Sequence, residues 1–427
     1  MEREFDYIIV GAGAGGATVA KELSKKNKNI LLIEKGYVEK SIGTFNDALR
    51  YFDGSKITKI PFKSKEGVTL WRAFMAGGSA FVAAGNYTRS FEREFKSMGI
   101  DLESEFLEAE KELHVAPLDD SLISEGSKTI ARAARQLGFN MEPMMKAIDP
   151  SKCIRCGQCM LGCRTGAKWT PIEYLNEASN NGVEIMYNTT VDKVISEKGT
   201  VKGILAHNAK EQITLNAKKV ILSAGGLSTP VILQSSGINE AGTNLFIDIF
   251  VCIYGLHKDL SLINEPQMAM VNLDFHNEKG FLLSPCVNHV RQIRFIEAGM
   301  KGFAMPTKRI LGIMIKIADE ESGYVYPDGS VSKVVTNQDR ERLNFGTAIS
   351  KKILEKAGVD PDTFIETHPA GAHPGGTAAI GRIIDTNLET RINNLYVCDA
   401  SVFPKAPGMP PILTIIALSK RLAKHLS

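Results

Sequence analysis

Four cysteines lie within a single short segment of this chain, at Cys153, Cys156, Cys159 and Cys163. Their spacing is C-x2-C-x2-C-x3-C, which allows one loop to wrap several thiolates around an iron–sulfur cluster. We predict a 4Fe-4S cluster. A 3Fe-4S cluster is the alternative, because Arg164 stands where ferredoxin-type runs place a proline and Cys163 is therefore the least secure ligand. A structural zinc ion and four unligated thiols remain as further interpretations of the motif.

A second chemical signal is the glycine-rich turn Gly11-Ala12-Gly13-Ala14-Gly15-Gly16. In the pattern G-x-G-x-x-G, the first glycine permits a tight turn, the second lets a pyrophosphate approach the backbone, and the third lets helix and strand pack closely. Glu34 follows the next apolar run and is placed to accept hydrogen bonds from a ribose. The turn therefore predicts a dinucleotide site, although it does not separate FAD from NAD.

The segments around this turn predict the elements that position it. Residues Tyr7–Val10 and Ile30–Ile33 are short apolar runs, and Ala17–Lys25 has helical periodicity. Strand, turn, helix and strand in this order form the first unit of a doubly wound sheet. A second unit of this kind begins at Val220–Ser223 and leads through Ala224-Gly225-Gly226 into a helix. The fold class is thus α/β, with a doubly wound Rossmann-type domain.

Three blocks near the end of the chain identify a family. They begin at His373-Pro-Gly-Gly-Thr377, Asn394-Leu-Tyr-Val-Cys-Asp399 and Pro410-Pro411-Ile-Leu-Thr414. They resemble the C-terminal signature of the glucose-methanol-choline family of FAD-dependent oxidoreductases. The resemblance extends to the glycine turn with Glu34-Lys35-Gly36, to Gly77-Gly78-Ser79, and to Ala224-Gly225 with Thr229-Pro230.

This resemblance implies FAD as cofactor, with Glu34 at the adenosine ribose, Asp399 and Ala400 near the ribityl chain, and the Gly77–Ser79 loop near the flavin ring. The cofactor-binding residues predicted for this chain are Gly11, Gly13, Ala14, Gly15, Gly16, Glu34, Lys35, Gly77, Gly78, Ser79, Asn86, Val191, Ala224, Gly225, Asp399, Ala400, Pro411 and Thr414.

His373 falls on the active-site histidine of the family, which helps to remove the substrate hydroxyl proton while hydride passes to the flavin. Imidazole suits this task because its ordinary pKa lies near working pH. A structural loop histidine is the alternative, and His368 is a less suitable substitute. One departure from the family pattern stands out. Pro410 occupies the place where members carry a second histidine or an asparagine, so the usual two-residue clamp on a substrate oxygen is missing.

The blocks also divide the chain. We predict an FAD-binding domain from residues 1–90, 171–241 and 371–427, the last part carrying the active-site histidine. Residues 91–150 are expected to form a helical segment, in which Phe91–His114 is charged and helical. Residues 151–170 form the cysteine-rich loop, and 242–370 an inserted α+β substrate domain built on an antiparallel sheet.

Composition limits the possible partners. The 427 residues carry a net charge of +3 from nearly balanced acids and bases, which predicts no nucleic-acid partner. No apolar run reaches the ~18 residues that span a bilayer, the nearest being Leu245–Tyr254 with Asp248 inside it. Without a leader segment, the protein is expected in the cytoplasm, where Cys252, Cys286 and Cys398 would be buried thiols rather than disulfides.

Together these signals predict a soluble oxidoreductase that acts on a CH-OH group of a small molecule. FAD accepts a two-electron hydride, and a cluster passes electrons on singly to an external acceptor such as a ferredoxin. This arrangement favours a dehydrogenase over an oxidase. The alternatives are a ferredoxin-driven reductase of a carbonyl or C=C bond, and an electron-transfer subunit of a larger complex.

Overall fold

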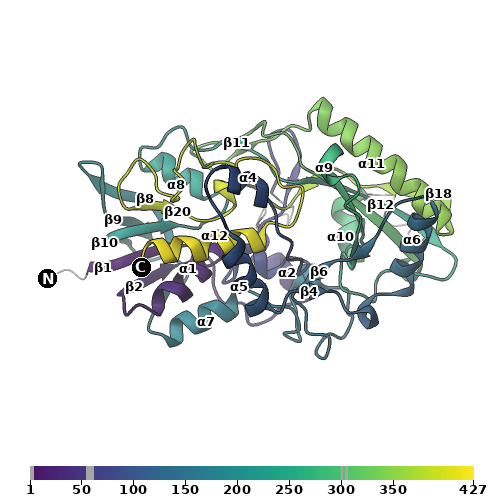
Figure 1. Ribbon diagram of the computed structural model, residues 1–427, viewed down its shortest axis with the longest axis horizontal. Coiled ribbons are helices and arrows are strands. Elements are labelled where there is room, and N and C mark those ends of the chain that lie inside the picture. Colours follow the sequence, from purple (N-terminus) through teal and green to yellow (C-terminus); the bar gives the residue numbers. More distant parts are fainter. Residues whose placement is uncertain (1–3, 54–61, 300–301, 303–305) are drawn as a thin grey trace.

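A computed structural model describes residues 4–53, 62–299, 302 and 306–427 (Figure 1). Two large β-sheets lie toward opposite ends of the molecule, each with its own covering helices. The chain termini lie at the end that holds the first sheet.

The first sheet has seven strands and contains the N-terminal glycine turn. Its order is β7-β2-β1-β10-β9-β8, and β20 also pairs with β10. Strands β7, β2, β1, β10 and β20 are parallel to their neighbours in this group, whereas β8, β9 and the first half of β10 form antiparallel hairpins. The strands are β1 (Glu4–Val10), β2 (Ile30–Ile33), β7 (Glu184–Met186), β8 (Thr190–Glu197), β9 (Thr200–His207), β10 (Gln212–Leu222) and β20 (Leu395–Val397).

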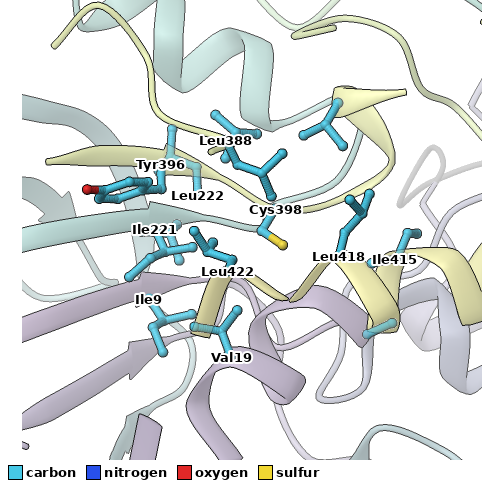
Figure 2. Close-up of a cluster of buried hydrophobic side chains, with 14 of the residues drawn as sticks. Ile9, Val19, Ile221, Leu222, Leu388, Tyr396, Cys398, Ile415, Leu418 and Leu422 are labelled. Carbon is cyan, nitrogen blue, oxygen red and sulfur yellow. The ribbon is translucent and has the colours of Figure 1, made fainter. Parts of the chain in front are cut away.

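Helices α1 (Ala14–Ser24) and α12 (Ile412–His425) pack together over this sheet, and α5 (Glu103–Leu113) and α7 (Ile172–Asn180) flank them. Between strands and helices lies a core of aliphatic side chains (Figure 2). Ile9, Ile221 and Leu418 are among its members, and each is at most 1% exposed. Removing such a side chain from water stabilises the fold by about 1.5–3 kcal/mol. Cys398 lies in the same core, and burial raises its pKa to about 12.

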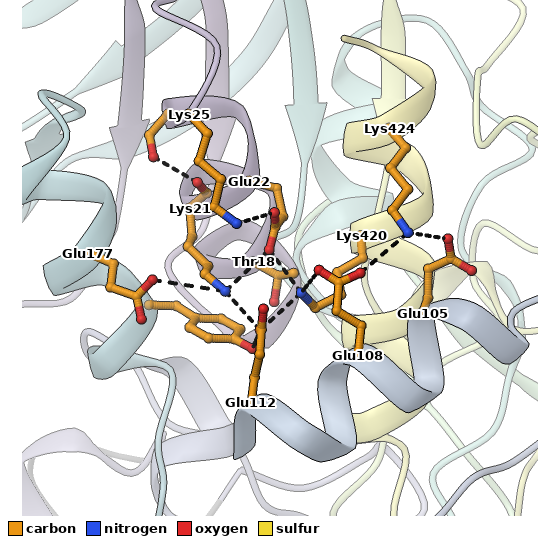
Figure 3. Close-up of polar contacts among 12 residues, drawn as sticks. Thr18, Lys21, Glu22, Lys25, Glu105, Glu108, Glu112, Glu177, Lys420 and Lys424 are labelled. Atoms are coloured by element: carbon orange, nitrogen blue, oxygen red, sulfur yellow. Dashed lines mark hydrogen bonds and ion pairs between the residues drawn. The ribbon is translucent and has the colours of Figure 1, made fainter. Parts of the chain in front are cut away.

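A network of ion pairs joins α1, α5 and α12 where the three helices face one another (Figure 3). Lys420 Nζ lies 2.9 Å from a carboxylate oxygen of each of Glu22, Glu108 and Glu112. Lys21 Nζ lies 2.8 Å from Glu112 as well. The three glutamates form the one compact group of candidate metal ligands found among the described residues. Lys25 and Lys424 pair with Glu22 and Glu108 in addition. Because lysines already neutralise all three glutamates, we assign this network to the scaffold.

The second sheet is mostly antiparallel, in the order β14-β15-β12-β19-β3, with β18 also paired to β12. Helix α11 (Asn337–Lys356) packs against it and begins with a capping box between Thr336 and Asp339. The strands are β3 (Thr69–Leu70), β12 (Ile249–His257), β14 (Phe281–Pro285), β15 (Ile310–Ile317), β18 (Val359–Glu366) and β19 (Ala370–Gly371).

Shorter elements connect the two sheets. The helices are α2 (Phe45–Tyr51), α3 (Gly78–Phe81), α4 (Glu92–Ser97), α6 (Glu125–Gln136), α8 (Thr229–Ser235), α9 (His276–Lys279) and α10 (Val290–Gln292). The strands are β4 (Ala116–Pro117), β5 (Glu142–Pro143), β6 (Met145–Lys146), β11 (Thr243–Leu245), β13 (Met270–Val271), β16 (Gly323–Val325) and β17 (Val331–Ser332).

The predicted fold class is confirmed: a doubly wound sheet is joined to a second region built on an antiparallel sheet. The helical character predicted for Phe91–His114 is found in two helices, α4 and α5, with a break between them. Gly99, with φ of +80°, follows the end of α4, and α5 starts only at Glu103. The domain boundaries stay a prediction. Among the described residues, none of the helices combines the length and apolar character that crossing a bilayer requires.

Candidate functional site

The predicted dinucleotide residues meet at one edge of the first sheet. Gly11 follows β1, Glu34 follows β2, Ala224 follows β10 by one residue, and Asp399 follows β20 by one residue. These are the carboxyl ends of parallel strands, where doubly wound sheets bind their ligands. All four residues line one cavity of about 660 Å³.

The glycine turn has the shape that a phosphate needs. A Cβ on Gly11 would lie 2.3 Å from Ser223 O, and one on Gly15 would lie 2.0 Å from Cys398 O, so both positions require glycine. A Cβ on Gly13 would meet no protein atom within 4 Å, and Gly13 lines the cavity. Helix α1 starts immediately after Gly13 without a side-chain cap, so its first amides can serve an anion.

Glu34 is held rigidly at the next strand end. Its two carboxylate oxygens accept hydrogen bonds from the backbone amides of Ala12 (2.8 Å) and Gly36 (2.7 Å). Burial raises the pKa of Glu34, and these amides oppose the shift. The carboxylate thus fixes the glycine turn relative to β2 while it lines the cavity where a ribose is predicted.

Asp399 performs a similar task at the other end of the cavity. Its Oδ2 accepts hydrogen bonds from Gly225 N (2.8 Å) and Thr229 Oγ1 (2.6 Å), and its Oδ1 accepts one from Ser401 N (2.8 Å). The carboxylate therefore ties the end of β20 to the end of β10.

Most of the predicted cofactor residues line this cavity, but Gly16, Gly77 and Thr414 are not among its lining residues. Gly16 packs against the backbone of Gly11, and Gly77 precedes α3 with φ of +86°. Thr414 Oγ1 bonds to Ser90. The lining residues from the predicted set are Gly11, Gly13, Ala14, Gly15, Glu34, Lys35, Gly78, Ser79, Asn86, Val191, Ala224, Gly225, Asp399, Ala400 and Pro411.

His373 lies at the part of the cavity formed by the second sheet. Its Nδ1 lies 2.8 Å from Asp248 Oδ2, while Asp248 Oδ1 accepts a hydrogen bond from Gly408 N (2.9 Å). Lys316 Nζ lies 3.5 Å from the same ring nitrogen. Burial, followed by the charge of Lys316, lowers the pKa of His373 well below its usual value. The imidazole is thus neutral near pH 7, with Nε2 left to act on a substrate.

We did not assign Asp248 or Lys316 to the site from the sequence, although the sequence contains a signal for both. Each is a single charged residue within an otherwise apolar stretch, Leu245–Tyr254 and Ile310–Ile317 respectively. Such residues are almost never fully buried without a reason. Burial raises the pKa of Asp248 and lowers that of Lys316, while each partner opposes the other's shift.

Pro410 lines the same cavity as His373, at the position where the resemblance implies a polar side chain. Its carbonyl accepts a hydrogen bond from Thr88 Oγ1 at 3.4 Å. His368, the weaker candidate, is exposed and is not among the cavity-lining residues.

The four clustered cysteines line a separate pocket of about 20 Å³. The loop between them is pinned at Gly157, where a Cβ would lie 2.3 Å from Ile263 O. No three of their sulfur atoms lie within 4.8 Å of one another in the described chain.

Two buried lysines stand beside this pocket. Lys168 Nζ donates hydrogen bonds to the carbonyls of Phe81 (2.8 Å), Ala83 (2.6 Å) and Cys159 (2.8 Å). Lys146 Nζ bonds to Asn86 Oδ1 and to the carbonyls of Ala84 and Gln267. Burial lowers the pKa of both lysines to about 8.

The thiols respond to this environment in different ways. Burial raises the pKa of Cys159, while the charges of Lys168 and Lys146 oppose that shift. For Cys163, burial acts in the same direction but is outweighed by hydrogen bonds from the backbone of Lys168 and from Thr165, so its pKa is lowered.

The two cavities share a thin wall. Cys159 lines the small pocket, and the next residue, Met160, lines the large cavity. Lys168 also lines the small pocket and binds the carbonyl of Ala83, which lines the large one. The structure therefore brings the cysteine loop directly beside the predicted flavin site.

Comparison with models of protein families identifies the family of this chain. The N-terminal model of the GMC oxidoreductases matches residues 5–249, and the C-terminal model matches residues 316–419. The chain belongs to the GMC oxidoreductase family. It is therefore an FAD-dependent oxidoreductase, as the resemblance of its C-terminal blocks implied.

Several proteins resemble this GMC oxidoreductase over its full length. An uncharacterized protein of Methanocaldococcus jannaschii is 34% identical over 99% of this chain and 100% of its own length. A long-chain-alcohol oxidase of Arabidopsis thaliana is 24% identical over 99% of this chain and 68% of its own length.

Solved structures show the same fold. A pyridoxine 4-oxidase from Mesorbium loti has a TM-score of 0.75 at 18% identity, covering 99% of both chains. A formate oxidase from Aspergillus oryzae that carries FAD has a TM-score of 0.77 at 15% identity, covering 100% of this chain and 98% of the other.

Proposed function

We propose that this GMC oxidoreductase is a dehydrogenase that oxidises a CH-OH group of a small molecule and passes the electrons singly through an iron–sulfur cluster to an external acceptor. Cys153, Cys156, Cys159 and Cys163 would hold the cluster, Cys163 being the least secure ligand. The observation that carries the proposal is the adjacency of Cys159 and Met160, one lining the cysteine pocket and the other the FAD cavity. Consecutive Cα atoms are about 3.8 Å apart, so any route for electrons across this wall is short.

The chain's own residues supply the remaining chemistry. Bound FAD is the hydride acceptor. His373 takes the hydroxyl proton on Nε2 as the C–H bond breaks and the carbonyl forms, so both hydrogens of the CH-OH group are accounted for. Asp248 stabilises the imidazolium through its 2.8 Å contact with Nδ1. Two equivalents of a one-electron acceptor, such as a ferredoxin, would then restore the enzyme.

The buried lysines support the anionic cluster. Lys146 and Lys168 place positive charge against Cys159, which offsets the charge of ligated thiolates. No carboxylate lies within ion-pair distance of either lysine in the part of the chain that the structure describes, so their charge is available to the pocket.

Anaerobic purification tests the cofactors first. We expect a brown protein with iron and acid-labile sulfide in fixed ratio to FAD, and an electron paramagnetic resonance signal after reduction. Cys156→Ser should abolish iron and sulfide while FAD remains. Cys398→Ser is the matched control, because Cys398 is a buried thiol outside the pocket. A colourless wild-type protein that contains FAD alone would remove the cluster.

His373→Ala then tests the reaction. A general base contributes about 10²–10⁴-fold, so reduction of the FAD by an active alcohol should slow about 10³-fold while the FAD and iron contents stay unchanged. Unchanged substrate turnover in His373→Ala, with loss of turnover in Cys156→Ser, would instead favour an electron-transfer subunit.

The reverse direction is the second candidate, because Pro410 removes a polar contact that family members use on an alcohol. In that case a reduced ferredoxin would drive reduction of a carbonyl or C=C bond at the same site. Reoxidation of the dithionite-reduced protein by aldehydes or unsaturated compounds, with no bleaching by alcohols, would favour this direction.

A further inference from the structure

Lys316 is a buried cation in the large cavity for which the proposed reaction has no use so far. It lies on β15 opposite Phe250 of β12, and it is 4% exposed. Its ammonium group lines the cavity, as do the neighbouring side chains of Phe250 and Met314. An ammonium group has three hydrogens to donate. Its contact with His373 Nδ1 is long, at 3.5 Å, and that nitrogen uses its hydrogen toward Asp248, so it offers Lys316 no lone pair.

The other polar groups of this end of the cavity are already engaged. Asn288 Nδ2 and Gln292 Nε2 both donate to Glu297 Oε1, at 2.6 and 2.8 Å. Arg72 Nε donates to Asp53 Oδ2 at 2.6 Å. Asp248 is committed to His373 and to Gly408 N. Lys316 is therefore the cation of this wall whose donors are least used.

We infer that Lys316 binds a carboxylate of the substrate, and that the substrate class is a 2-hydroxy carboxylate whose hydroxyl group lies at His373. Lys316 Nζ lies 3.5 Å from Nδ1, and Nε2 is two bonds away in the same ring, so Lys316 and Nε2 can reach oxygens on adjacent carbons of one substrate. A desolvated carboxylate satisfies several ammonium hydrogens at once, and charged hydrogen bonds of this kind are about twice as strong as neutral ones. The side chain of Pro410, which also lines the cavity, has no polar atom to hold a substrate oxygen, so orientation of the substrate falls to Lys316.

This inference rests on the proposed reaction for the role of His373, but its first test does not require turnover. Acetate and its neutral isostere acetamide are titrated into the FAD-loaded wild-type protein, and binding is followed by the visible flavin spectrum and by calorimetry. We expect acetate to bind at least ~10-fold more tightly than acetamide, because a charged hydrogen bond contributes about 1.5–3 kcal/mol. Equal affinities for the two probes would overturn the inference without any variant.

Variants then assign the effect to one side chain. Lys316→Met should reduce acetate affinity to that of acetamide, and Lys316→Arg should retain part of the difference. Arg72→Met is the matched control: Arg72 lines the same cavity, but Asp53 already neutralises it, so the preference for acetate should persist. Full acetate preference in Lys316→Met, with bound FAD retained, would contradict the assignment. If Lys316→Met does not retain FAD, Lys316→Gln takes its place in the titration. The comparison of acetate with acetamide in the wild-type protein then still tests the inference.

Substrate kinetics complete the test. A panel of 2-hydroxy carboxylates and the matching 1,2-diols is offered under anaerobic conditions, and FAD reduction is recorded. Preference for the acids, lost through a raised KM in Lys316→Met, supports the inference, whereas preference for the diols overturns it. If acetate binding depends on Lys316 but no alcohol reduces the FAD, the anion site is supported and the proposed reaction is contradicted.

Discussion

Two regions of this GMC oxidoreductase bury lysine ammonium groups, and they treat the charge in opposite ways. Behind the first sheet, Lys420 is 1% exposed and is surrounded by Glu22, Glu108 and Glu112 (Figure 3). Burial acts to lower its pKa, but bonds to the three carboxylates outweigh that effect and raise it. Beside the cysteine pocket, Lys146 and Lys168 bind carbonyl and amide oxygens, and their pKa values fall to about 8.

This difference in counterions distinguishes a region that only stabilises the fold from a region that is a candidate functional site. In the first region each positive charge is neutralised by the chain itself, so nothing further is needed to explain it. In the second region two positive charges face a pocket of thiols. Burying a charge without a counterion is costly, and a protein retains such an arrangement where an anion completes it. The cluster proposed above would supply such anions, as thiolates of the four cysteines that line this pocket.

The largest expected effect comes from Lys168→Met compared with Lys420→Met. The first change leaves three buried carbonyls without a donor and should lower the free energy of unfolding by about 4 kcal/mol. The second frees glutamates that are 14–37% exposed and can be hydrated, so the loss should be about 1–2 kcal/mol. Denaturant unfolding of the FAD-loaded proteins measures both. Equal losses would erase the distinction between the regions.

Gly157→Ala sharpens the comparison at the pocket itself. Gly157 and Gly166 both have φ of +65°, but only at Gly157 would a Cβ collide, 2.3 Å from Ile263 O. A left-handed conformation alone costs about 1 kcal/mol, which is the expected loss for Gly166→Ala. Gly157→Ala should cost about 2–3 kcal/mol and should also lower the iron content per FAD, since displacement of the loop moves the ligands. Similar iron contents in both variants would show that the loop geometry is not needed by a cluster.

How much of this could be predicted depends on the distance between partners along the chain. Gly11, Gly15 and Glu34 lie within one strand–helix–strand unit, so local spacing was sufficient to predict their grouping, and the structure places them around one cavity. The cysteines likewise converge on one pocket because they share one loop. Neither case required knowledge of the rest of the fold.

The partners of His373 could not be found in this way. Asp248 is 125 residues away, directly before β12, and Lys316 is 57 residues away on β15. Their meeting depends on the pairing of β12 with β15 and β19. Phe250 of β12 pairs with Lys316 of β15 and also with Ala370 of β19, three residues before His373. Strand pairing across such separations is set by the whole core rather than by local pattern. The lysines beside Cys159 were missed for the same reason, since their acceptors come from the 81–86 segment.

The smallest expected effect is on the acid stability of the region around Lys420. Burial is the largest single influence on the pKa of Glu22 and acts to raise it. Hydrogen bonds from Lys25 and Lys420 together outweigh burial and lower this pKa to about 2. A carboxyl group whose pKa is lowered on folding contributes stability that is present above its unfolded pKa and is lost as pH falls through the folded value. Glu22→Gln should therefore cost about 1 kcal/mol at neutral pH, and this difference from wild type should shrink as pH falls from about 4.5 to 2.

Urea unfolding of both proteins across this acid range measures the change, and Glu177→Gln serves as control. Glu177 is 54% exposed and lies 3.9 Å from Lys21, so its replacement should leave stability unchanged at every pH. A cost of Glu22→Gln that stays constant through the acid range would mean that the side chain acts by packing rather than charge. In that case Lys420 would not be neutralised by Glu22 in the way that distinguishes it from Lys146 and Lys168, and the contrast between the two regions would rest on Glu108 and Glu112 alone.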